Sequence, residues 1–271
     1  MKPAGQTDKI GPYVSIVREE RIARVTFDRG DGLNALSIAL MQDLKRAAEA
    51  LREASDISAI VLSGGQVFSA GADLADPELA ARDTMGLVEH RNALRLGPDM
   101  CDAWARLEAI TIVAIEGFCI GGGLALAASC DHRVIAQAAH FRLPEVPLGM
   151  NMSWRSVPRL VALIGPSRAK ELIALGRKVE AGEALNWGLA DRVTPAGEAE
   201  AQALALAEQY AALPPLATRM AKEAIDVSAQ PLGHATSFMD RDQFLLARGS
   251  ADHREAVSAF LEKRSADFKG K

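Results

Sequence analysis

The segment TIVAIEGFCIGGGLALAASCD, residues 111–131, decides the fold. It opens with five apolar or β-branched residues, 111–115, a pattern typical of a strand buried in a sheet that is covered on both faces. Three consecutive glycines, Gly121 to Gly123, then precede an alanine-rich stretch with the composition of a helix. The segment therefore predicts a strand, a glycine-rich turn and a helix in close succession.

A similar arrangement occurs earlier in the chain, where the short run AIVL at 59–62 precedes a second glycine-rich turn, SAGADL at 69–74. Further strand and helix signals surround these two segments. Alternating residues at 13–17 and 22–27 predict a β-hairpin, Ser37 is suited to cap a helix, and 133–136 and 140–143 read as extended. Repeated β-β-α units favour a layered or spiral α/β core over a barrel of eight βα pairs.

The flanking regions differ from this core. Residues 74–86 have no clear period and predict a surface segment before a helix at about 87–107, whereas from residue 167 onward the pattern is almost all helical. Helices with so little sheet left to cover are expected to contact another subunit. We therefore divide the chain into a flexible tail at 1–11, an α/β core at 12–196 and a helical region at 197–271.

Composition excludes several classes of protein. The 271 residues carry 31 Lys and Arg against 35 Asp and Glu, a net charge of -4 without a long basic run, so nucleic acid is not an expected partner. No apolar run approaches the roughly 20 residues that span a bilayer. The N-terminus lacks the apolar stretch of a signal peptide, and three cysteines are too few for a disulfide framework. The cytoplasm is the expected compartment.

The two glycine-rich turns are candidates for a ligand site. Glycine lets the backbone approach a ligand closely, and the first N–H groups of a helix have no internal acceptor. The pair of turns could therefore bind an anion or a developing oxyanion. The alternative is that the glycines only close turns or allow close packing. Neither turn matches a nucleotide-binding fingerprint.

Glu145 is a carboxylate within an apolar, proline-rich stretch, FRLPEVPLG at 141–149. Burial there would raise its pKa and suit it to proton transfer. The alternative is a surface glutamate or an ion-pair partner for Arg142.

Other residue types suggest alternatives with less support. His132 and His140 have no Cys, His or carboxylate at metal-ligand spacing, so no metal site is expected. Ser69 or Ser153 with either histidine could form a serine hydrolase, although the chain has no Gly-x-Ser-x-Gly motif. Cys119 reads as a small core residue, as does Cys130.

The order of these motifs resembles the enoyl-CoA hydratase/isomerase, or crotonase, superfamily over residues 13–269. The matching stretches are GLNAL at 32–36, FSAGADL at 68–74, IGGGLALAASCD at 120–131, Pro144-Glu145, 184–193 with Gly188-Leu189, and AFLEKR at 259–264 with Phe268-Lys269. The resemblance implies a crotonase-like spiral of ββα units and a helical C-terminal region that assembles trimers or dimers of trimers. It also implies an acyl-CoA thioester substrate, with no cofactor beyond the coenzyme A of that substrate.

The resemblance also assigns roles to particular residues. The N–H groups of Ala72 and Gly122 match the oxyanion hole that holds the thioester oxygen as it becomes an enolate, and Glu145 matches a catalytic acid/base. The residues matching the coenzyme A contacts are Gly32, Leu33, Ala70, Asp73 and Leu74, together with Phe260 and Lys263 at the nucleotide end from a neighbouring subunit. For Asp73, a helix cap is the alternative.

The chain departs from the family pattern at one catalytic position. Hydratases of this family hold and activate a water with two glutamates, and Ala125 stands where the first is expected. One carboxylate suffices for 3,2-enoyl-CoA isomerases and for relatives that hydrate aromatic enoyl thioesters. The lyase or isomerase branch therefore stays open, as do thioester hydrolysis and a catalytically silent protein that binds CoA esters.

The segment after Glu145 also differs, because Asn151 to Arg155 replaces the usual glycine-rich stretch. Asn151 or Ser153 could orient a water, and Trp154 adds bulk that could reshape the acyl pocket. The alternative is a helix start capped by Ser153, with Trp154 as packing.

Overall fold

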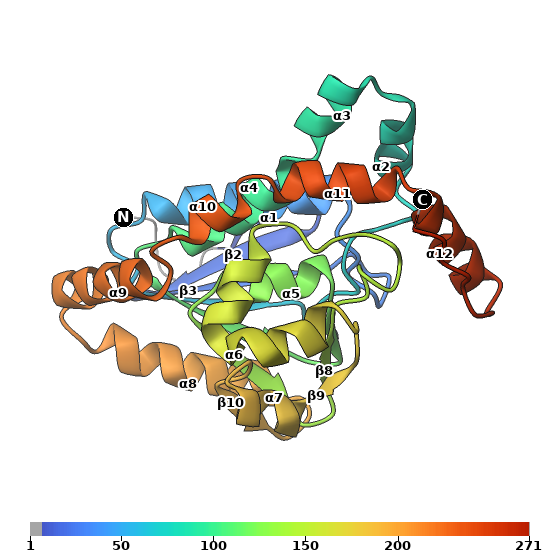
Figure 1. Cartoon of the computed structure of the whole chain (residues 1–271). Coiled ribbons are helices and arrows are strands. Elements are labelled where there is room, and N and C mark those ends of the chain that lie inside the picture. The colour runs from blue at the N-terminus through green and yellow to red at the C-terminus, as the bar shows by residue number, and fades with distance from the viewer. Residues whose placement is uncertain (1–6, 271) are drawn as a thin grey trace.

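The computed structural model describes residues 7–270, apart from the side chain of residue 83. Its main feature is a seven-stranded sheet in the order β1-β2-β3-β4-β5-β7-β10, and a smaller sheet has the order β6-β8-β9 (Figure 1). The strands are β1 Thr7–Ile10, β2 Val14–Glu19, β3 Ile22–Phe27, β4 Ala59–Ser63, β5 Ile110–Ile115, β6 Phe118–Ile120, β7 His132–Ala136, β8 His140–Arg142, β9 Val179–Glu180 and β10 Arg192–Thr194.

The chain alternates between the two sheets. It passes from β5 in the large sheet to β6 in the small one and then enters a helix, and it repeats this path through β7 and β8. Strands β3, β4, β5, β7 and β10 are parallel neighbours, and β6 is parallel to β8. The spiral of ββα units that the sequence predicts is confirmed.

The helices cover both faces of the large sheet, and some of them extend beyond it. They are α1 Ile38–Arg52, α2 Pro77–Ala81, α3 Leu87–Ala93, α4 Leu96–Ala105, α5 Gly122–Ala127, α6 Ser156–Ile173, α7 Ala181–Trp187, α8 Ala199–Ala211, α9 Pro215–Ala229, α10 Gly233–Ser237, α11 Asp240–Arg248 and α12 Ala251–Leu261, with a short 3-10 helix η1 at Arg82–Thr84. Figure 1 shows the sheet between α1 and α4 on one side and α8 on the other.

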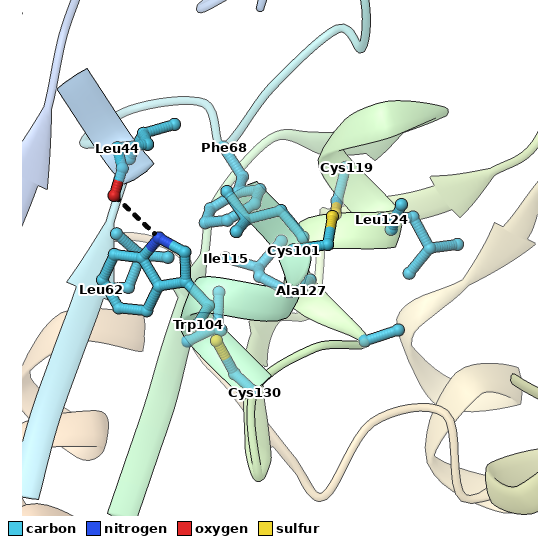
Figure 2. Close-up of a cluster of buried hydrophobic side chains, with 14 of the residues drawn as sticks. Leu44, Leu62, Phe68, Cys101, Trp104, Ile115, Cys119, Leu124, Ala127 and Cys130 are labelled. Atoms are coloured by element: carbon cyan, nitrogen blue, oxygen red, sulfur yellow. Dashed lines mark hydrogen bonds between the residues drawn. The ribbon is translucent and has the colours of Figure 1, made fainter. Parts of the chain in front are cut away.

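The larger core cluster is closely packed around α1, α4, α5 and the inner faces of the strands. The indole of Trp104 is fully buried and donates from Nε1 to the carbonyl of Leu44, 3.1 Å away (Figure 2). Cys101, Cys119 and Cys130 are free and buried in this cluster, as expected for the last two. Burial raises the pKa of Cys101 and of Cys130 to about 12, so both thiols stay protonated near neutral pH.

The N-terminal tail is shorter than the sequence analysis predicts. Residues 1–6 lie outside the described residues, but Thr7–Ile10 form β1, which pairs antiparallel with β2. The prediction of a loose tail is wrong for these four residues. An edge strand is held by backbone hydrogen bonds to one neighbour, and β1 buries no side chain fully, so no apolar alternation marks it in the sequence.

Helix α8 also differs from its expected place. It falls in the region 197–271 that was assigned to subunit contact, yet its Ala199, Ala203 and Leu206 form the second core cluster with β4, β5 and β7. This face of α8 covers the outer face of its own sheet, and the assignment of the region to subunit contact stays a prediction. The small side chains of its alanines let α8 pack closely against the sheet. An alanine-rich stretch predicts a helix but does not indicate which surface that helix packs against.

Two predicted segments are subdivided. The irregular segment at 74–86 contains α2 and η1, and the helix expected at about 87–107 is two helices, α3 and α4. Pro98 accounts for the break, because it has no N–H to donate to Leu94 and is tolerated only in the first turn of a helix. None of the helices described for residues 7–270 combines the length and apolarity needed to cross a bilayer.

Candidate active site

The two glycine-rich turns lie against each other. A Cβ built on Gly71 would be 2.9 Å from the carbonyl oxygen of Ile120 and 3.5 Å from the nitrogen of Gly122, so only glycine fits at this contact. Gly71 (φ +88°) and Gly121 (φ +53°) also adopt the left-handed region that favours glycine. The turns extend the small sheet through the bridge between Ser69 and Cys119.

Both predicted oxyanion donors have free N–H groups. Leu36 pairs with the peptides on either side of Ala72, donating to the carbonyl of Gly71 at 2.7 Å and accepting from Asp73 at 3.2 Å. In this bridge the N–H of Ala72 points away from Leu36, and it has no acceptor among the described residues. Gly122 is the first residue of α5, so its N–H has no acceptor within the helix. The backbone therefore presents two free donors on adjoining turns.

Glu145 lies beside these turns. It follows β8, and a Cβ built on Gly121 would be 2.8 Å from its Oε1. Its Oε2 is buried without a hydrogen-bond partner among residues 7–270. Burial raises the pKa of Glu145 from its ordinary 4.5 to about 7. The alternative of an ion pair with Arg142 is wrong, because Oε2 of Glu145 has no partner in the part of the chain that the structure describes and Arg142 donates from Nε to the carbonyl of Gly176 at 2.9 Å.

The surroundings of Glu145 provide no second carboxylate on α5. Ala125 is fully buried, and every residue of α5 from Gly122 to Ala127 is a buried glycine, alanine or leucine. Ala125, where the resemblance leads us to expect the first glutamate of a hydratase, is thus an apolar part of the core.

Trp154 lies directly against the second turn. A Cβ built on Gly122 would overlap the benzo ring of Trp154, and one built on Gly97 of α4 would overlap the same indole. The alternative in which Trp154 packs against its surroundings is confirmed, and its effect on the acyl pocket stays a prediction. The expected cap is wrong: Arg155 precedes α6, and Ser153 accepts from Ser156 through its backbone carbonyl.

Four of the predicted coenzyme A contacts lie together beside the first turn. The N–H of Ala70 donates to the carbonyl of Leu33 at 2.9 Å, and Leu33 and Leu74 expose 50% and 74% of their surfaces. Gly32 has open space around it. A bound molecule could therefore run across this exposed strip without displacing any core side chain.

Asp73 already has partners within the chain. Its Oδ2 accepts from Arg29 at 2.6 Å, and its Oδ1 accepts from the N–H of Ala75 at 3.0 Å. The cap of α2 is Asp76, so the helix-cap alternative for Asp73 is wrong, and its contact with coenzyme A stays a prediction.

The last two predicted contacts lie apart from the turns. Phe260 is 64% exposed at the end of α12, with Lys263 just beyond it. Figure 1 shows α12 projecting from the body of the molecule, away from α5. Within one chain they are not brought to the site.

The hydrolase alternative has no geometric support. Ser69 is fully buried, and its hydroxyl donates to the carbonyl of Asn34 at 2.8 Å. His132 contacts the Tyr210 hydroxyl at 2.8 Å, and His140 stands near Phe118. Across residues 7–270, no group of three His, Cys, Asp or Glu side chains could hold a metal ion.

Two positioning residues escaped the sequence analysis. The Asn34 side chain donates to the carbonyls of Gly64 and Val67, at 2.7 and 3.0 Å, and so ties its loop to the segment before the first turn. Asp240 of α11 accepts from the N–H of Arg155 at 2.6 Å and fixes the segment that carries Trp154. Asn34 could have been found from the sequence, because it lies within the motif GLNAL. Asp240 could not, because its partner Arg155 is 85 residues away in the sequence.

This combination of a ββα spiral and two facing backbone turns defines the crotonase fold. The solved enoyl-CoA hydratase of Bacillus anthracis superposes on it with a TM-score of 0.75 at 32% identity, covering 96% of this chain and all of that one. A family model described as enoyl-CoA hydratase/isomerase matches residues 17–271. The chain therefore belongs to the enoyl-CoA hydratase/isomerase family.

Two relatives of known name are similar over nearly their whole length. A probable enoyl-CoA hydratase of Mycobacterium bovis is 32% identical over 259 residues, covering 94% of this chain and 97% of that protein. The 2,3-dehydroadipyl-CoA hydratase of Escherichia coli is 34% identical over 260 residues, covering 94% and 98%.

Proposed function

We propose that the protein is an acyl-CoA enzyme that moves a proton between carbons of an enoyl thioester, as a 3,2-enoyl-CoA isomerase does. Glu145 takes a proton from carbon 2 of a 3-enoyl-CoA, and the electron pair moves onto the thioester oxygen to give a dienolate. The N–H groups of Ala72 and Gly122 donate to that oxygen. Glu145 then returns the proton to carbon 4, and the carbon 2–carbon 3 double bond forms as the thioester is restored.

The observation that carries this proposal is the unpaired, buried Oε2 of Glu145 beside the turn at Gly121. A pKa of about 7 suits a group that must both accept and release a proton near neutral pH. Two backbone donors that are fixed before the charge develops need little reorganisation, and losing one such donor typically costs about 3 to 4 kcal/mol of transition-state stabilisation.

A second candidate function is hydration, which one observation favours. Asn151 Oδ1 is buried without a partner among the described residues, as is Glu145 Oε2. Both are acceptors that a water molecule could satisfy. The names of the relatives from M. bovis and E. coli support this branch. In it, Asn151 replaces the absent glutamate in orienting the water that Glu145 activates.

The proposed substrate is held by its coenzyme A portion. Gly32, Leu33, Ala70 and Leu74 form the exposed strip beside the oxyanion donors, in line with a ligand that enters from solvent. Phe260 and Lys263 reach the nucleotide end from a neighbouring subunit of a trimer or dimer of trimers. The outward position of α12 supports that arrangement.

Incubation with 3-hexenoyl-CoA separates the two reactions. Isomerisation gives a conjugated thioester that absorbs in the ultraviolet without a change of mass. Hydration is tested on 2-hexenoyl-CoA, whose double bond is conjugated with the thioester, and adds the mass of one water to it. The proposal expects conjugation first and a loss of about a hundredfold to ten-thousandfold in Glu145→Gln. Glu180→Gln, at an exposed residue paired with Lys178, is the matched control and should retain activity.

The same experiment tests the silent-protein alternative. Unchanged 3-hexenoyl-CoA would contradict the proposed isomerisation. If 2-hexenoyl-CoA is also unchanged, with binding of both esters intact by calorimetry, the result favours a CoA-ester-binding protein. Activity of Glu145→Gln within a few fold of the wild type would remove Glu145 as the acid/base.

A further inference from the structure

The indole of Trp154 fills the space between α4 and α5. Its pyrrole side lies against Gly97 and its benzo side against Gly122, and at both positions the absence of a side chain makes room for the ring. Gly97 stands in the first turn of α4, where glycine is a poor helix former. The ring's need for this space accounts for a glycine at that position. Trp154 itself is only partly buried, so part of this residue is open to solvent.

A charged network holds Trp154 in place. Trp154 (φ +60°) and Arg155 (φ +55°) both adopt the left-handed region, which is unfavourable for bulky side chains. Asp240 accepts from the N–H of Arg155, and the Arg155 side chain pairs with Asp102 of α4. Arg159 pairs with the same Asp102 at 3.0 Å. Strain that the surroundings maintain in this way is typical of functional sites.

The position of the ring relative to the catalytic groups suggests what it contacts. Gly121 lies against the carboxylate of Glu145, and the next residue, Gly122, lies against the indole. A thioester whose oxygen accepts from the N–H of Gly122 places its reacting carbons at Glu145. Carbons beyond them that continue past the N-terminus of α5 would meet Trp154, which lies between Gly122 of α5 and Gly97 of α4.

We propose that Trp154 is the end wall of the acyl pocket and restricts the protein to short acyl groups. The inference rests on the proposed function, because it concerns the acyl chain of the same thioester. A rigid indole wedged between two glycines cannot rotate away without moving α4 or α5, so a longer chain meets it as a steric barrier. Discrimination of this kind is worth about tenfold or more for each methylene that does not fit.

The test compares acyl length in the wild type and in Trp154→Ala. Turnover of butenoyl, hexenoyl, octenoyl and decenoyl-CoA is measured as kcat/KM, and binding of the matching saturated esters by calorimetry. The wild type should favour the shortest esters. Trp154→Ala should raise the ratio of decenoyl to butenoyl by about tenfold or more, and Trp154→Phe should lie between the two.

The control is Trp187→Ala, which also removes a tryptophan side chain. Trp187 is the last residue of α7, and its ring stacks against Arg177. It should leave the length profile unchanged. If Trp154→Ala does not fold, Trp154→Gly opens the same space and suits the positive φ. An unchanged length profile in folded Trp154 variants, with wild-type turnover intact, overturns the inference alone. If the wild type binds no CoA ester at all, the proposed function fails and the inference with it.

Discussion

At the scale of single residues, the burial of Glu145 sets the pH dependence of the reaction. The carboxyl must be ionised to take a proton, and its pKa is raised to about 7 by loss of hydration. We therefore expect kcat/KM to fall about tenfold per pH unit below that value and to level off above it. A pH profile measured with buffers of constant ionic strength checks this, and a midpoint near the ordinary pKa of 4.5 would contradict it.

The same carboxyl lowers the stability of the folded protein at neutral pH. Its folded-state pKa of about 7 lies above the ordinary 4.5, so ionisation is more costly in the folded chain, and stability is lost as pH rises from 4.5 through 7. Glu145→Gln removes this cost. The variant should be more stable than the wild type above about pH 7, by up to about 3 kcal/mol, and should gain nothing at pH 4. Denaturant unfolding at both pH values measures the difference.

Gly122 and Trp154 should be energetically coupled. A methyl group at Gly122 would overlap the indole, so Gly122→Ala should destabilise the wild type by about 1 to 3 kcal/mol. In a Trp154→Ala background the same change should cost much less. A double-mutant cycle of unfolding free energies measures this coupling. Additive effects would mean that the ring does not occupy the space beside Gly122.

At the scale of helices and strands, Asp76 links two helix starts. Its Oδ2 accepts from the first N–H of α1, at Ile38, and its Oδ1 accepts from Glu78 of α2, both at 2.8 Å. Asp76→Ala should therefore cost about 2 kcal/mol, more than the roughly 1 kcal/mol expected for Ser37→Ala, which removes one cap bond of α1. Thermal unfolding of the two variants compares them, and a smaller loss for Asp76→Ala would contradict the double role.

Elements with a strong local signal were predictable from the sequence. The hairpin β2-β3, the buried strand β5 and the helix capped by Ser37 were all predicted close to their observed bounds. Strands β1 and β9 were not, because each is short and held by backbone pairing to one neighbour. Such pairing depends on where the partner strand lies, which no local pattern encodes.

The placement of the candidate site residues was predictable to a similar extent, and their roles stay predictions. The sequence pointed to Ala72, Gly122 and Glu145, and the structure brings the turns that carry them together. The indole against Gly97 was not predictable, nor was the support of Trp154 by Asp240. Both depend on contacts between the segment before α6 and helices far away in sequence, and these contacts exist only in the folded chain.

At the scale of the whole molecule, α9 differs from an ordinary amphipathic helix, because it buries a charged residue and exposes its apolar side chains. The structure describes α9 in full, and its one buried residue is Lys222, whose Nζ donates to Asp131 at 2.7 Å and to the carbonyl of Ala109 at 3.0 Å. Its apolar side chains Leu216, Met220 and Ile225 are 61% to 71% exposed. An outward apolar face of this kind usually meets another protein surface.

The outward face of α9 yields a prediction about assembly. If it forms part of the proposed subunit interface, replacing Met220 and Ile225 with glutamate should bury charge there and dissociate the oligomer. Light scattering after size-exclusion chromatography should then give the mass of one 28.9 kDa chain. Glu223→Lys, an exposed polar change on the same helix, is the control and should leave the mass unchanged.

Because Phe260 and Lys263 are proposed to reach the coenzyme A of a neighbouring subunit, dissociation should also weaken acyl-CoA binding while each subunit keeps its own oxyanion donors. An unchanged mass in the double variant would place the interface elsewhere.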